Sequence, residues 1–334
     1  MCLELSVIVP TYNRCRRLEE CLTALVEQEV GCDLEIIVVD DCSSDETPGV
    51  GGKFSARHGS VKYVRNAGNL GRCYTRNRGI KMARGRTIVM IDDDVIAERG
   101  CLKAHLAIQS DYRGERIAVM GNVTYCSDCI RGSNIARYVQ SRYLGARRGN
   151  GIDRCDLRPT HFGTLNCSFQ REDAIKVGLL DERFRYYGGE DVDFAFRLRR
   201  DGVRLVFSYD AKAEHYDTIT VRRYKEKICQ LARNGLKISA NESPEILSAS
   251  GYRFLVPYNS RIDSVLLGVA KFFVPFIVNR RLVRAAERFA LWSDAKPHLY
   301  FKWLYYYLIA GWTVAGFFEA VSERETVRYG ECEE

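Results

Sequence analysis

TIVMIDDD, residues 87–94, is the stretch that decides the fold of this chain. Its first five residues are β-branched or apolar, a composition that predicts a buried strand. The strand is followed directly by Asp92, Asp93 and Asp94. Neighbouring carboxylates repel one another unless a cation lies among them, and such oxygen ligands suit Mg²⁺ or Mn²⁺ bridging to substrate phosphates. The stretch therefore predicts a metal–phosphate site at a strand end, with a solvated acidic turn as the alternative.

The composition is that of a globular protein. A chain of 334 residues can bury a full core, and its hydrophobic content of 46% and charged content of 28% are not those of a disordered protein. The formal net charge of +7 favours an anionic partner such as a nucleotide, a phospholipid surface or an anionic glycan. So mild an excess does not predict a nucleic-acid partner.

The cysteines and the N-terminus predict a reducing compartment. Residues 1–10 lack a basic stretch followed by an apolar one, so no secretory signal is predicted. Without that signal the 13 cysteines are expected to be reduced thiols, in the cytoplasm or at the cytoplasmic face of a membrane. Cys126 and Cys129 form a single C-x-x-C pair, whereas structural zinc usually needs a second recognisable pair. Scattered thiols are therefore the favoured interpretation.

Apolar runs and helical periodicity alternate along the N-terminal part of the chain. They predict strands over 5–9, 34–39, 61–64 and 87–91, and helices over 18–26 and from 68–71 to Ala83. Near-continuous apolar runs are typical of strands buried on both faces of a parallel sheet. The alternating order predicts a doubly wound α/β domain. Further along, the pattern predicts a strand over 117–124, a helix over 134–144 and a helix beginning at Glu190.

Polar side chains follow three of these strands. They are Thr11-Tyr12-Asn13, Asp40-Asp41 and the three aspartates at 92–94. Because open α/β sheets bind ligands outside the carboxyl ends of their strands, we expect the three groups to meet at one rim. No G-x-G-x-x-G follows the first strand and the sequence contains no G-x-x-x-x-G-K-[ST], so dinucleotide and P-loop sites are not predicted. The sequence predicts a nucleotide–metal site instead.

Four motifs together resemble those of the family 2 glycosyltransferases with the GT-A fold. They are SVIVPTYNR at 6–14, EIIVVDDCSSD at 35–45, the stretch 66–85 and IDDD at 91–94, in the order and with the separations usual in that family. The resemblance reaches about residue 220. It implies an α/β, Rossmann-like nucleotide-diphospho-sugar transferase domain over 1–240, followed by a mostly helical region over 241–334. Within that domain, residues 1–110 would bind the nucleotide, and residues 111–240 would hold the acceptor and the base.

The resemblance also implies roles for individual residues. Pro10, Thr11 and Tyr12, with Asn13 beside them, match the loop that lines the donor base, and Asp41 matches an acid that accepts a hydrogen bond from it. Asp93 matches a position near the ribose, and Asp92 and Asp94 match the D-x-D carboxylates around the cation. Asn166, in a strand resembling the one beside the donor sugar, is expected to contact that sugar. Arg76 is expected either to place a positive charge near the phosphates or to lie on a solvated helix face.

GGEDVDF at 188–194 is the second centre of the predicted chemistry. Asp191, next to Glu190, matches the acid that acts as general base in the family, and a carboxylate suits the removal of a hydroxyl proton as the new bond forms. The alternative is that these acids only complement a helix dipole. A single base opposite a departing diphosphate implies one displacement with inversion at the anomeric carbon. His215 matches a further cation ligand of some family members, with a structural histidine as the alternative; an imidazole ligand would favour Mn²⁺ over Mg²⁺.

The C-terminal region combines apolar, aromatic and basic stretches. Residues 265–278 and 303–318 are apolar, the second without a charge but shorter than the ~20 residues that usually span a bilayer. Between them, residues 280–288 read as a basic amphipathic helix. The region 265–318 is therefore expected either to form a helical subdomain packed on the catalytic domain or on a second copy, or to make peripheral contact with a membrane. The basic loop RRGNG at 147–151 is expected either to close over an anionic donor or to be an ordinary surface loop.

The function predicted from these residues is metal-dependent, inverting transfer of a sugar from a nucleotide-diphosphate donor, a UDP-sugar being favoured, to a glycan or lipid-linked acceptor. A sugar-phosphate nucleotidyltransferase is the first alternative, since it also uses acidic strand ends and Mg²⁺. It would need a basic loop after the first strand, where this chain has Thr-Tyr-Asn and then Arg14. A non-catalytic module that binds sugar nucleotide or glycan is the second. The intact acids at 92–94 and 190–191 argue against it.

Overall fold

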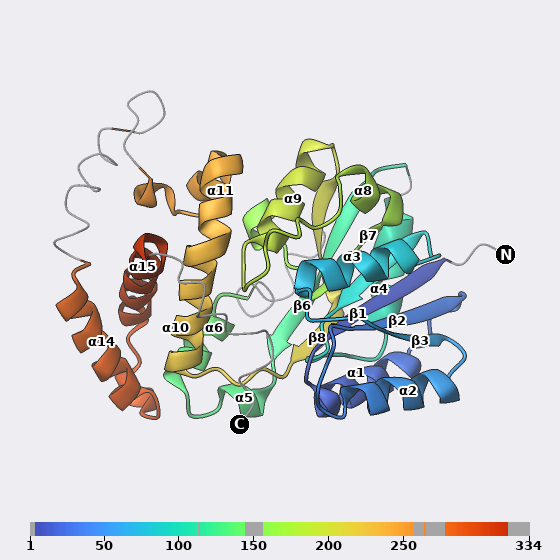
Figure 1. Ribbon diagram of the computed structural model, residues 1–334, viewed down its shortest axis with the longest axis horizontal. Helices are drawn as coiled ribbons and strands as arrows, with labels where there is room; N and C mark the ends of the chain where they lie inside the picture. The colour runs from blue at the N-terminus through green and yellow to red at the C-terminus, as the bar shows by residue number, and fades with distance from the viewer. Residues whose placement is uncertain (1–3, 113, 144–155, 257–263, 265–277, 320–334) are drawn as a thin grey trace.

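A sheet covered by helices on both faces forms one end of the molecule, and a group of helices forms the other end (Figure 1). The structure is a computed structural model, and it describes residues 4–112, 114–143, 156–256, 264 and 278–319. The α/β class and the mostly helical C-terminal region predicted from the sequence are both confirmed. The loop at 147–151 and the apolar stretch up to residue 277 lie outside the described residues.

The described residues form an eight-stranded mixed sheet in the order β3-β2-β1-β4-β7-β6-β8-β5. Strands β3, β2, β1 and β4 are parallel, as the apolar runs predict, whereas β7 is antiparallel to both β4 and β6. Strand β6 pairs in parallel with β8, and β5 pairs antiparallel with β8. The strands are β1 (Leu5–Thr11), β2 (Leu34–Asp40), β3 (Val61–Arg65), β4 (Thr87–Ile91), β5 (Val95–Ala97), β6 (Ile117–Tyr125), β7 (Asn166–Gln170) and β8 (Arg204–His215).

The strand register brings the predicted polar groups to one edge. Thr11 at the end of β1 pairs with Asp40 at the end of β2, and the aspartates at 92–94 follow β4 directly. Strand β1 continues through Pro10 to Thr11, so it is longer than the strand predicted over 5–9. A proline is tolerated there because the pairing of β1 with β4 ends at Ile8 and Met90, so the missing N–H interrupts no ladder with β4.

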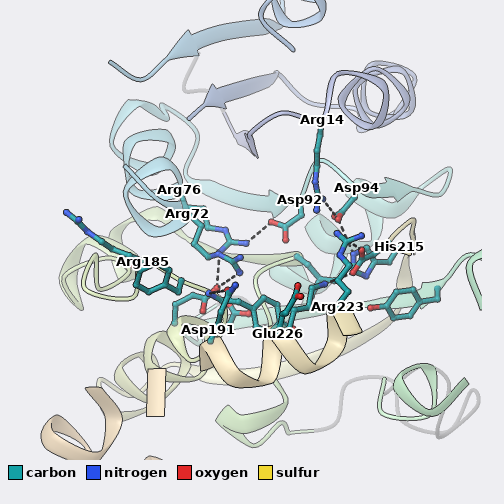
Figure 2. A pocket seen from close by; sticks show the side chains of 18 of the residues that line it. Arg14, Arg72, Arg76, Asp92, Asp94, Arg185, Asp191, His215, Arg223 and Glu226 are labelled. Atoms are coloured by element: carbon teal, nitrogen blue, oxygen red, sulfur yellow. Dashed lines mark hydrogen bonds and ion pairs between the residues drawn. The ribbon is translucent and has the colours of Figure 1, made fainter. Parts of the chain in front are cut away.

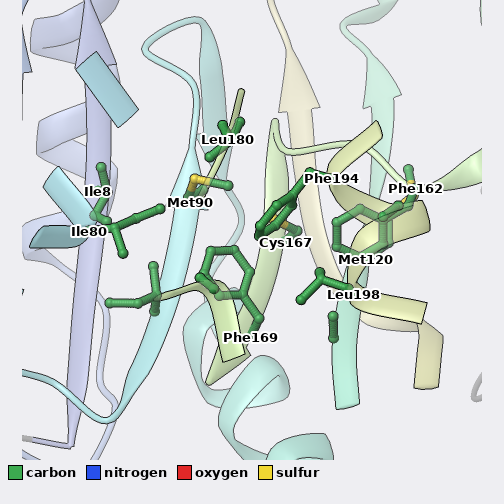
Figure 3. Close-up of a cluster of buried hydrophobic side chains, with 14 of the residues drawn as sticks. Ile8, Ile80, Met90, Met120, Phe162, Cys167, Phe169, Leu180, Phe194 and Leu198 are labelled. Atoms are coloured by element: carbon green, nitrogen blue, oxygen red, sulfur yellow. The ribbon is translucent and has the colours of Figure 1, made fainter. Parts of the chain in front are cut away.

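Alternate residues of each central strand enter separate cores. One face of the sheet packs against α1 (Cys15–Val26), α2 (Thr47–Arg57) and α4 (Cys101–Asp111). The other face, drawn in Figure 3, places Ile8, Met90 and Phe169 against α3 (Arg72–Met82), α8 (Arg171–Lys176) and α9 (Glu190–Arg200). Burial on both faces explains why these strands read as continuous apolar runs.

Helix α2 is absent from the sequence prediction. Its sequence, TPGVGGKFSAR, contains a proline and three glycines, which lower intrinsic helix propensity. Packing requires at least one of them: a Cβ on Gly51 would lie 2.2 Å from Cδ2 of Tyr63 on β3. Tertiary contact between α2 and the sheet therefore overrides local preference.

The C-terminal helices α14 and α15 pack against α6 and α10 through a core of their own. Tyr138 of α6 (Asn134–Gln140), Ile228 of α10 (Val221–Gln230), Ala290 of α14 (Arg280–Ser293) and Trp312 of α15 (Lys302–Phe318) share one buried cluster. Helix α6 ends at Gln140, earlier than predicted, and the boundary at residue 240 stays a prediction. The remaining short elements are α5 (Ser127–Ile130), α11 (Leu236–Glu242), α12 (Pro244–Ala249), a π-helix at Leu231–Gly235 and 3₁₀ turns at Pro159–His161, Arg253–Leu255 and Pro297–Leu299.

None of the helices among the described residues has both the length and the apolar character needed to cross a bilayer. The apolar, aromatic helix α15 instead buries Leu308 and Trp312 against its neighbours. The alternative prediction, a helical subdomain packed on the catalytic domain, thus explains the buried face of this helix.

Candidate active site

A cavity opens at the carboxyl edge of the sheet, between the strand ends and helices α9 and α10. Figure 2 shows Asp92 and Asp94 on one side of it, with Asp191 and Glu226 on the opposite side. The lining also includes cationic side chains of several elements and a group of tyrosines, namely Arg14, Arg72, Arg76, Arg223, Lys227, Tyr125, Tyr143 and Tyr187. Residues from both halves of the predicted catalytic domain therefore meet at one cavity.

The aspartates after β4 are held by the loop after β1. Thr11 donates a hydrogen bond from Oγ1 to Oδ2 of the fully buried Asp93 at 2.7 Å. Arg14 donates to Asp93 Oδ1 at 3.2 Å and ion-pairs with Asp94. Arg14 is a site residue that the sequence prediction missed, although it directly follows the predicted loop.

The charge pattern makes these neighbouring acids unequal. Burial raises the pKa of Asp93 to about 7, despite the opposing effect of Arg14. Burial would also raise the pKa of Asp94, but the charges of Arg14 and His215 hold that pKa well below its usual range. Asp94 is therefore the acid that stays ionised most readily.

Two arginines on successive turns of α3 connect the aspartates to helix α9. Arg76 Nη2 lies 2.7 Å from Asp92 Oδ1, and its Nη1 lies 3.5 Å from Glu190 Oε1. Arg72 Nη1 lies 3.1 Å from the same Glu190 oxygen. With 3% of its side chain exposed, Arg76 does not lie on a solvated helix face, so that alternative is wrong.

Polar atoms beside the cavity retain hydrogen-bonding capacity. Within the described part of the chain, Nε of Arg76 and Oε2 of Glu190 are buried and form no hydrogen bond. Buried polar atoms are normally paired in native proteins, and exceptions gather where a ligand or water completes the set. These two atoms, a donor on Arg76 and an acceptor on Glu190, are therefore suited to binding a polar ligand in the cavity.

Asp191 is the second residue of helix α9, which follows two glycines whose backbone is left-handed. Gly188 and Gly189 have φ of 90° and 99°, values that a side chain would strain. Thr164 donates a hydrogen bond from Oγ1 to Asp191 Oδ1 at 2.5 Å. Burial, followed by the charge of Glu190, raises the pKa of Asp191 to about 6, while Arg76 opposes the shift. A carboxylate with a pKa near neutrality suits a general base.

His215, at the end of β8, lies beside Asp94. Its Nε2 is 3.3 Å from Asp94 Oδ2, and the hydroxyl of Tyr143 is 3.4 Å from its Nδ1. An ionised carboxylate and an imidazole that face each other are donors that fit Mn²⁺. Asp92 is turned to Arg76, and among the residues that the structure describes no group of three or more His, Cys, Asp or Glu side chains is arranged to hold a metal. The structure thus brings Asp94 and His215 together, and their role as ligands stays a prediction.

The other predicted donor contacts are mostly buried. The carboxylate of Asp41 accepts hydrogen bonds from Asn66 Nδ2 and from the backbone N–H groups of Leu70 and Gly71, and so fixes the loop before α3. Tyr12 is 6% exposed, and Asn13, at φ 50°, accepts a hydrogen bond from the backbone N–H of Ser44. The roles of these residues and of Pro10 in donor binding stay predictions.

Asn166 is fully buried away from the cavity wall. Its amide donates to the carbonyl of Ala211 at 2.9 Å, and its Oδ1 lies 2.9 Å from Nε2 of the buried His105. The neighbouring Leu165 lines the cavity instead. A sugar contact by Asn166 would require this network to change, and the assignment stays a prediction.

Helix α10 supplies a wall that the sequence analysis did not anticipate. Arg223 and Lys227 both ion-pair with Asp217, at 3.0 and 2.6 Å, and Lys227 also lies over the ring of Tyr187. The sequence feature that could have indicated this wall is the basic run VRRYKEK at 221–227, which follows shortly after His215 and Asp217. A basic run alone usually forms a solvated face, so only the packing of α10 identifies it as part of the site.

Comparison with known proteins agrees with this geometry. The model of Glycosyl transferase family 2 matches residues 6–178, and that described as N-terminal domain of galactosyltransferase matches residues 153–223. Chondroitin synthase of Pasteurella multocida (strain Pm70) is 24% identical over 291 residues, which cover 74% of this chain and 30% of that protein. Validoxylamine A glucosyltransferase of Streptomyces hygroscopicus subsp. jinggangensis (strain 5008) is 27% identical over 229 residues, 62% of this chain and 54% of that protein. The chain thus spans less than two thirds of the length of these relatives.

Solved structures share the fold along nearly the whole chain. The mannosyltransferase PcManGT from Pyrobaculum calidifontis, in complex with GDP-Man and Mn²⁺, superposes with a TM-score of 0.59 at 21% identity and covers 92% of this chain and 85% of its own. S. aureus TarS in complex with UDP-GlcNAc gives a TM-score of 0.55 at 16% identity, covering 94% and 89%. At such identities the likeness concerns the fold. Because the family match spans more than half of the sequence, the prediction from the four motifs is confirmed: the chain belongs to glycosyltransferase family 2 and has the GT-A fold.

Proposed function

We propose that this protein is a metal-dependent, inverting glycosyltransferase that moves a sugar from a nucleotide-diphosphate donor to a glycan or lipid-linked acceptor. The observation that carries the proposal is the pairing across one cavity of Asp191, with a pKa raised to about 6, and the aspartate–arginine group after β4. One side is suited to accepting a proton, and the other to holding a charged diphosphate.

The donor diphosphate would be bound by cations of two elements. Arg72 and Arg76 come from α3 and Arg14 from the loop after β1, and all three line the cavity. The structural neighbours named above were solved with GDP-Man and UDP-GlcNAc, which supports a nucleotide sugar as donor. The motifs favour a UDP-sugar.

Asp191 would accept the proton of the acceptor hydroxyl as its oxygen attacks the anomeric carbon. The bond between that carbon and the phosphate oxygen breaks with its electron pair, and the nucleoside diphosphate leaves. Thr164 orients the carboxylate through its hydrogen bond, and Arg76 stabilises the negative charge that develops on the leaving group. Attack from the side opposite the leaving group gives inversion.

Asp94 and His215 would hold the divalent cation, Mn²⁺ being favoured by the imidazole. When bound, such an ion neutralises charge on the departing diphosphate. Arg14, which ion-pairs with Asp94 in this structure, would then keep its second partner, Asp93.

Calorimetric titration with UDP-, GDP- and dTDP-sugars, each with and without Mn²⁺, tests the proposal. We expect one nucleotide sugar to bind in the presence of metal and to bind much more weakly without it. Binding of a nucleoside triphosphate in place of every nucleotide sugar would support a nucleotidyltransferase and would remove Asp191 from the mechanism. A donor that binds but is never turned over, with any acceptor supplied, would favour a non-catalytic binding module.

A further inference from the structure

An exposed row of aromatic side chains covers the outer end of the molecule. Phe289 and Trp292 lie on α14, and Phe301 and Trp303 lie where the chain enters α15. Neighbouring ring centroids are 5.7 Å apart for Phe289 and Trp292, 6.2 Å for Phe289 and Phe301, and 6.0 Å for Phe301 and Trp303. Trp292 is 59% and Trp303 66% exposed, so these four residues, here called the aromatic row, form a continuous apolar strip in contact with water.

The aromatic row is separate from the buried side of α14. The helix packs on α15 through small side chains, and a Cβ on Gly311 would lie 2.6 Å from Val283 Cγ2. Ala290 is fully buried in the same contact. Phe289 and Trp292 therefore lie on a face of α14 that the other described residues leave exposed. Helix α14 itself lies at the outer end of the molecule (Figure 1). Contiguous exposed apolar surface of this kind marks an interaction site.

Basic side chains flank the aromatic row. Arg281, Arg284 and Arg288 are exposed and are spaced three and four residues apart, which places them on one face of α14. Lys296 Nζ lies 3.3 Å from the centroid of the Trp292 ring, and Lys302 is exposed between Phe301 and Trp303. Rings and cations therefore share one surface.

The acids of this segment face inwards. Residues 278–303 contain six basic residues and two acidic ones, Glu287 and Asp294. Glu287 accepts hydrogen bonds from Lys225 Nζ at 2.9 and 3.0 Å, and Asp294 caps α6 through the N–H of Ile135 at 2.8 Å. The outward face over 278–303 is thus positively charged as well as apolar.

We propose that this face is a docking surface for a bilayer that contains anionic lipids. Tryptophan and phenylalanine rings are favoured at the level of the headgroups, where the apolar part of the ring leaves water. The arginines beside them would contact the lipid phosphates, whose negative charge complements theirs. A second copy of the chain is a poorer partner, because a two-fold contact would place identical rows of arginines against each other.

Helix α10 connects this surface with the cavity. Arg223 and Lys227 line the cavity, while Ile228 packs in the cluster shared with α14 and α15. Helix α10 therefore lies between the proposed docking surface and the cavity. The docking surface consists of residues of α14 and its neighbours alone and does not depend on the proposed reaction.

Co-sedimentation with vesicles tests the proposal on the full chain. We expect binding to phosphatidylcholine vesicles that contain about one third phosphatidylglycerol, weak binding to phosphatidylcholine alone, and loss of binding as salt is raised. The double variants Trp292→Ser/Trp303→Ser and Arg284→Glu/Arg288→Glu should each weaken binding by at least about tenfold. Thermal unfolding would verify that every variant is folded.

Matched substitutions elsewhere on the surface serve as controls. Ile175→Ser removes an exposed apolar side chain of α8, and Arg57→Glu/Lys103→Glu reverses two exposed charges on α2 and α4; both should bind vesicles like the parent chain. Equal binding by the α14 variants, or no binding by the parent chain, would overturn the proposal. Self-association that is lost in Trp292→Ser/Trp303→Ser, without vesicle binding by the parent, would overturn it in favour of a second copy.

Discussion

The two walls of the cavity hold their acids in different ways. On the sheet side, Asp94 ion-pairs with Arg14 and Asp92 with Arg76, so a guanidinium directly compensates each carboxylate. On the helix side, Asp191 accepts its hydrogen bond from the neutral hydroxyl of Thr164 and has the charged Glu190 beside it. The pKa of Asp94 is therefore lowered and that of Asp191 raised, although both are aspartates near one cavity.

This difference divides the proposed reaction between the walls. A carboxylate with a lowered pKa stays charged and suits the binding of a cation and a diphosphate. A carboxylate with a pKa of about 6 exchanges its proton near neutral pH and suits catalysis. The pattern of partners, rather than the residue type, assigns the roles.

Removal of the helix-side carboxylate should have the largest effect. We expect Asp191→Asn to lower kcat by roughly a thousandfold, because the amide accepts no proton, while donor binding stays within a factor of a few. The matched control is Asp193→Asn on the same helix, where the carboxylate ion-pairs with Arg197 and does not line the cavity. Steady-state kinetics and donor titration measure the two effects; full turnover by Asp191→Asn would break the comparison.

Removal of a sheet-side carboxylate should act on binding instead. Asp94→Ala should weaken Mn²⁺-dependent donor binding by at least about a hundredfold, since it removes both the proposed cation ligand and the partner of Arg14. Asp33→Ala, at an exposed aspartate just before β2 at the other end of the sheet, is the control. Calorimetry with and without Mn²⁺ distinguishes them. Unchanged metal dependence in Asp94→Ala would place the cation elsewhere.

The pH dependence of turnover should report the helix-side acid. Because the base must be deprotonated, kcat/KM, which reports groups of the free enzyme, should fall about tenfold per pH unit below the pKa of about 6 and level off above it. This acidic limb of the pH profile, in which activity falls as the pH is lowered, should be absent from the residual activity of Asp191→Asn. A wild-type profile that stays flat from acidic to neutral pH would show that a group other than Asp191 takes the proton.

Two substitutions beside Asp191 should displace that limb in opposite directions. Thr164→Val removes a hydrogen bond to the charged form and should raise the pKa, whereas Glu190→Gln removes a neighbouring negative charge and should lower it. At pH 6 each change should alter kcat/KM by no more than about tenfold. Thr164→Ser, which keeps the hydroxyl, is the control. Displacement of both limbs in the same direction would contradict the assigned causes.

Local patterns predicted most of the elements that carry the site. The strand before Asp92 and the helix that begins at Glu190 lie where apolar periodicity and turn residues place them, whereas β1 extends to Thr11, which was predicted to lie in the following loop. Helix α2 was not predicted, because Gly51 lowers its helix propensity but is required by the close contact with Tyr63. No local sequence pattern encodes that contact. Asn166 lies in the predicted strand region, but its side chain is hydrogen-bonded to His105 of α4 and to the carbonyl of Ala211 and does not line the cavity, because long-range packing decides the partners of a buried amide.

The sequence by itself determined the family, the α/β class and the convergence of the acids at one rim, because strand ends and their order are local properties of the chain. Only the tertiary structure decided which carboxylate pairs with which arginine. Arg14 reaches Asp94 across 80 positions, and Arg72 reaches Glu190 across 118. Such contacts join the ends of strands and helices far apart in the sequence, and the pKa of a carboxylate depends on burial and on charges within a few ångströms. The division of labour between the two walls is therefore a property of the fold.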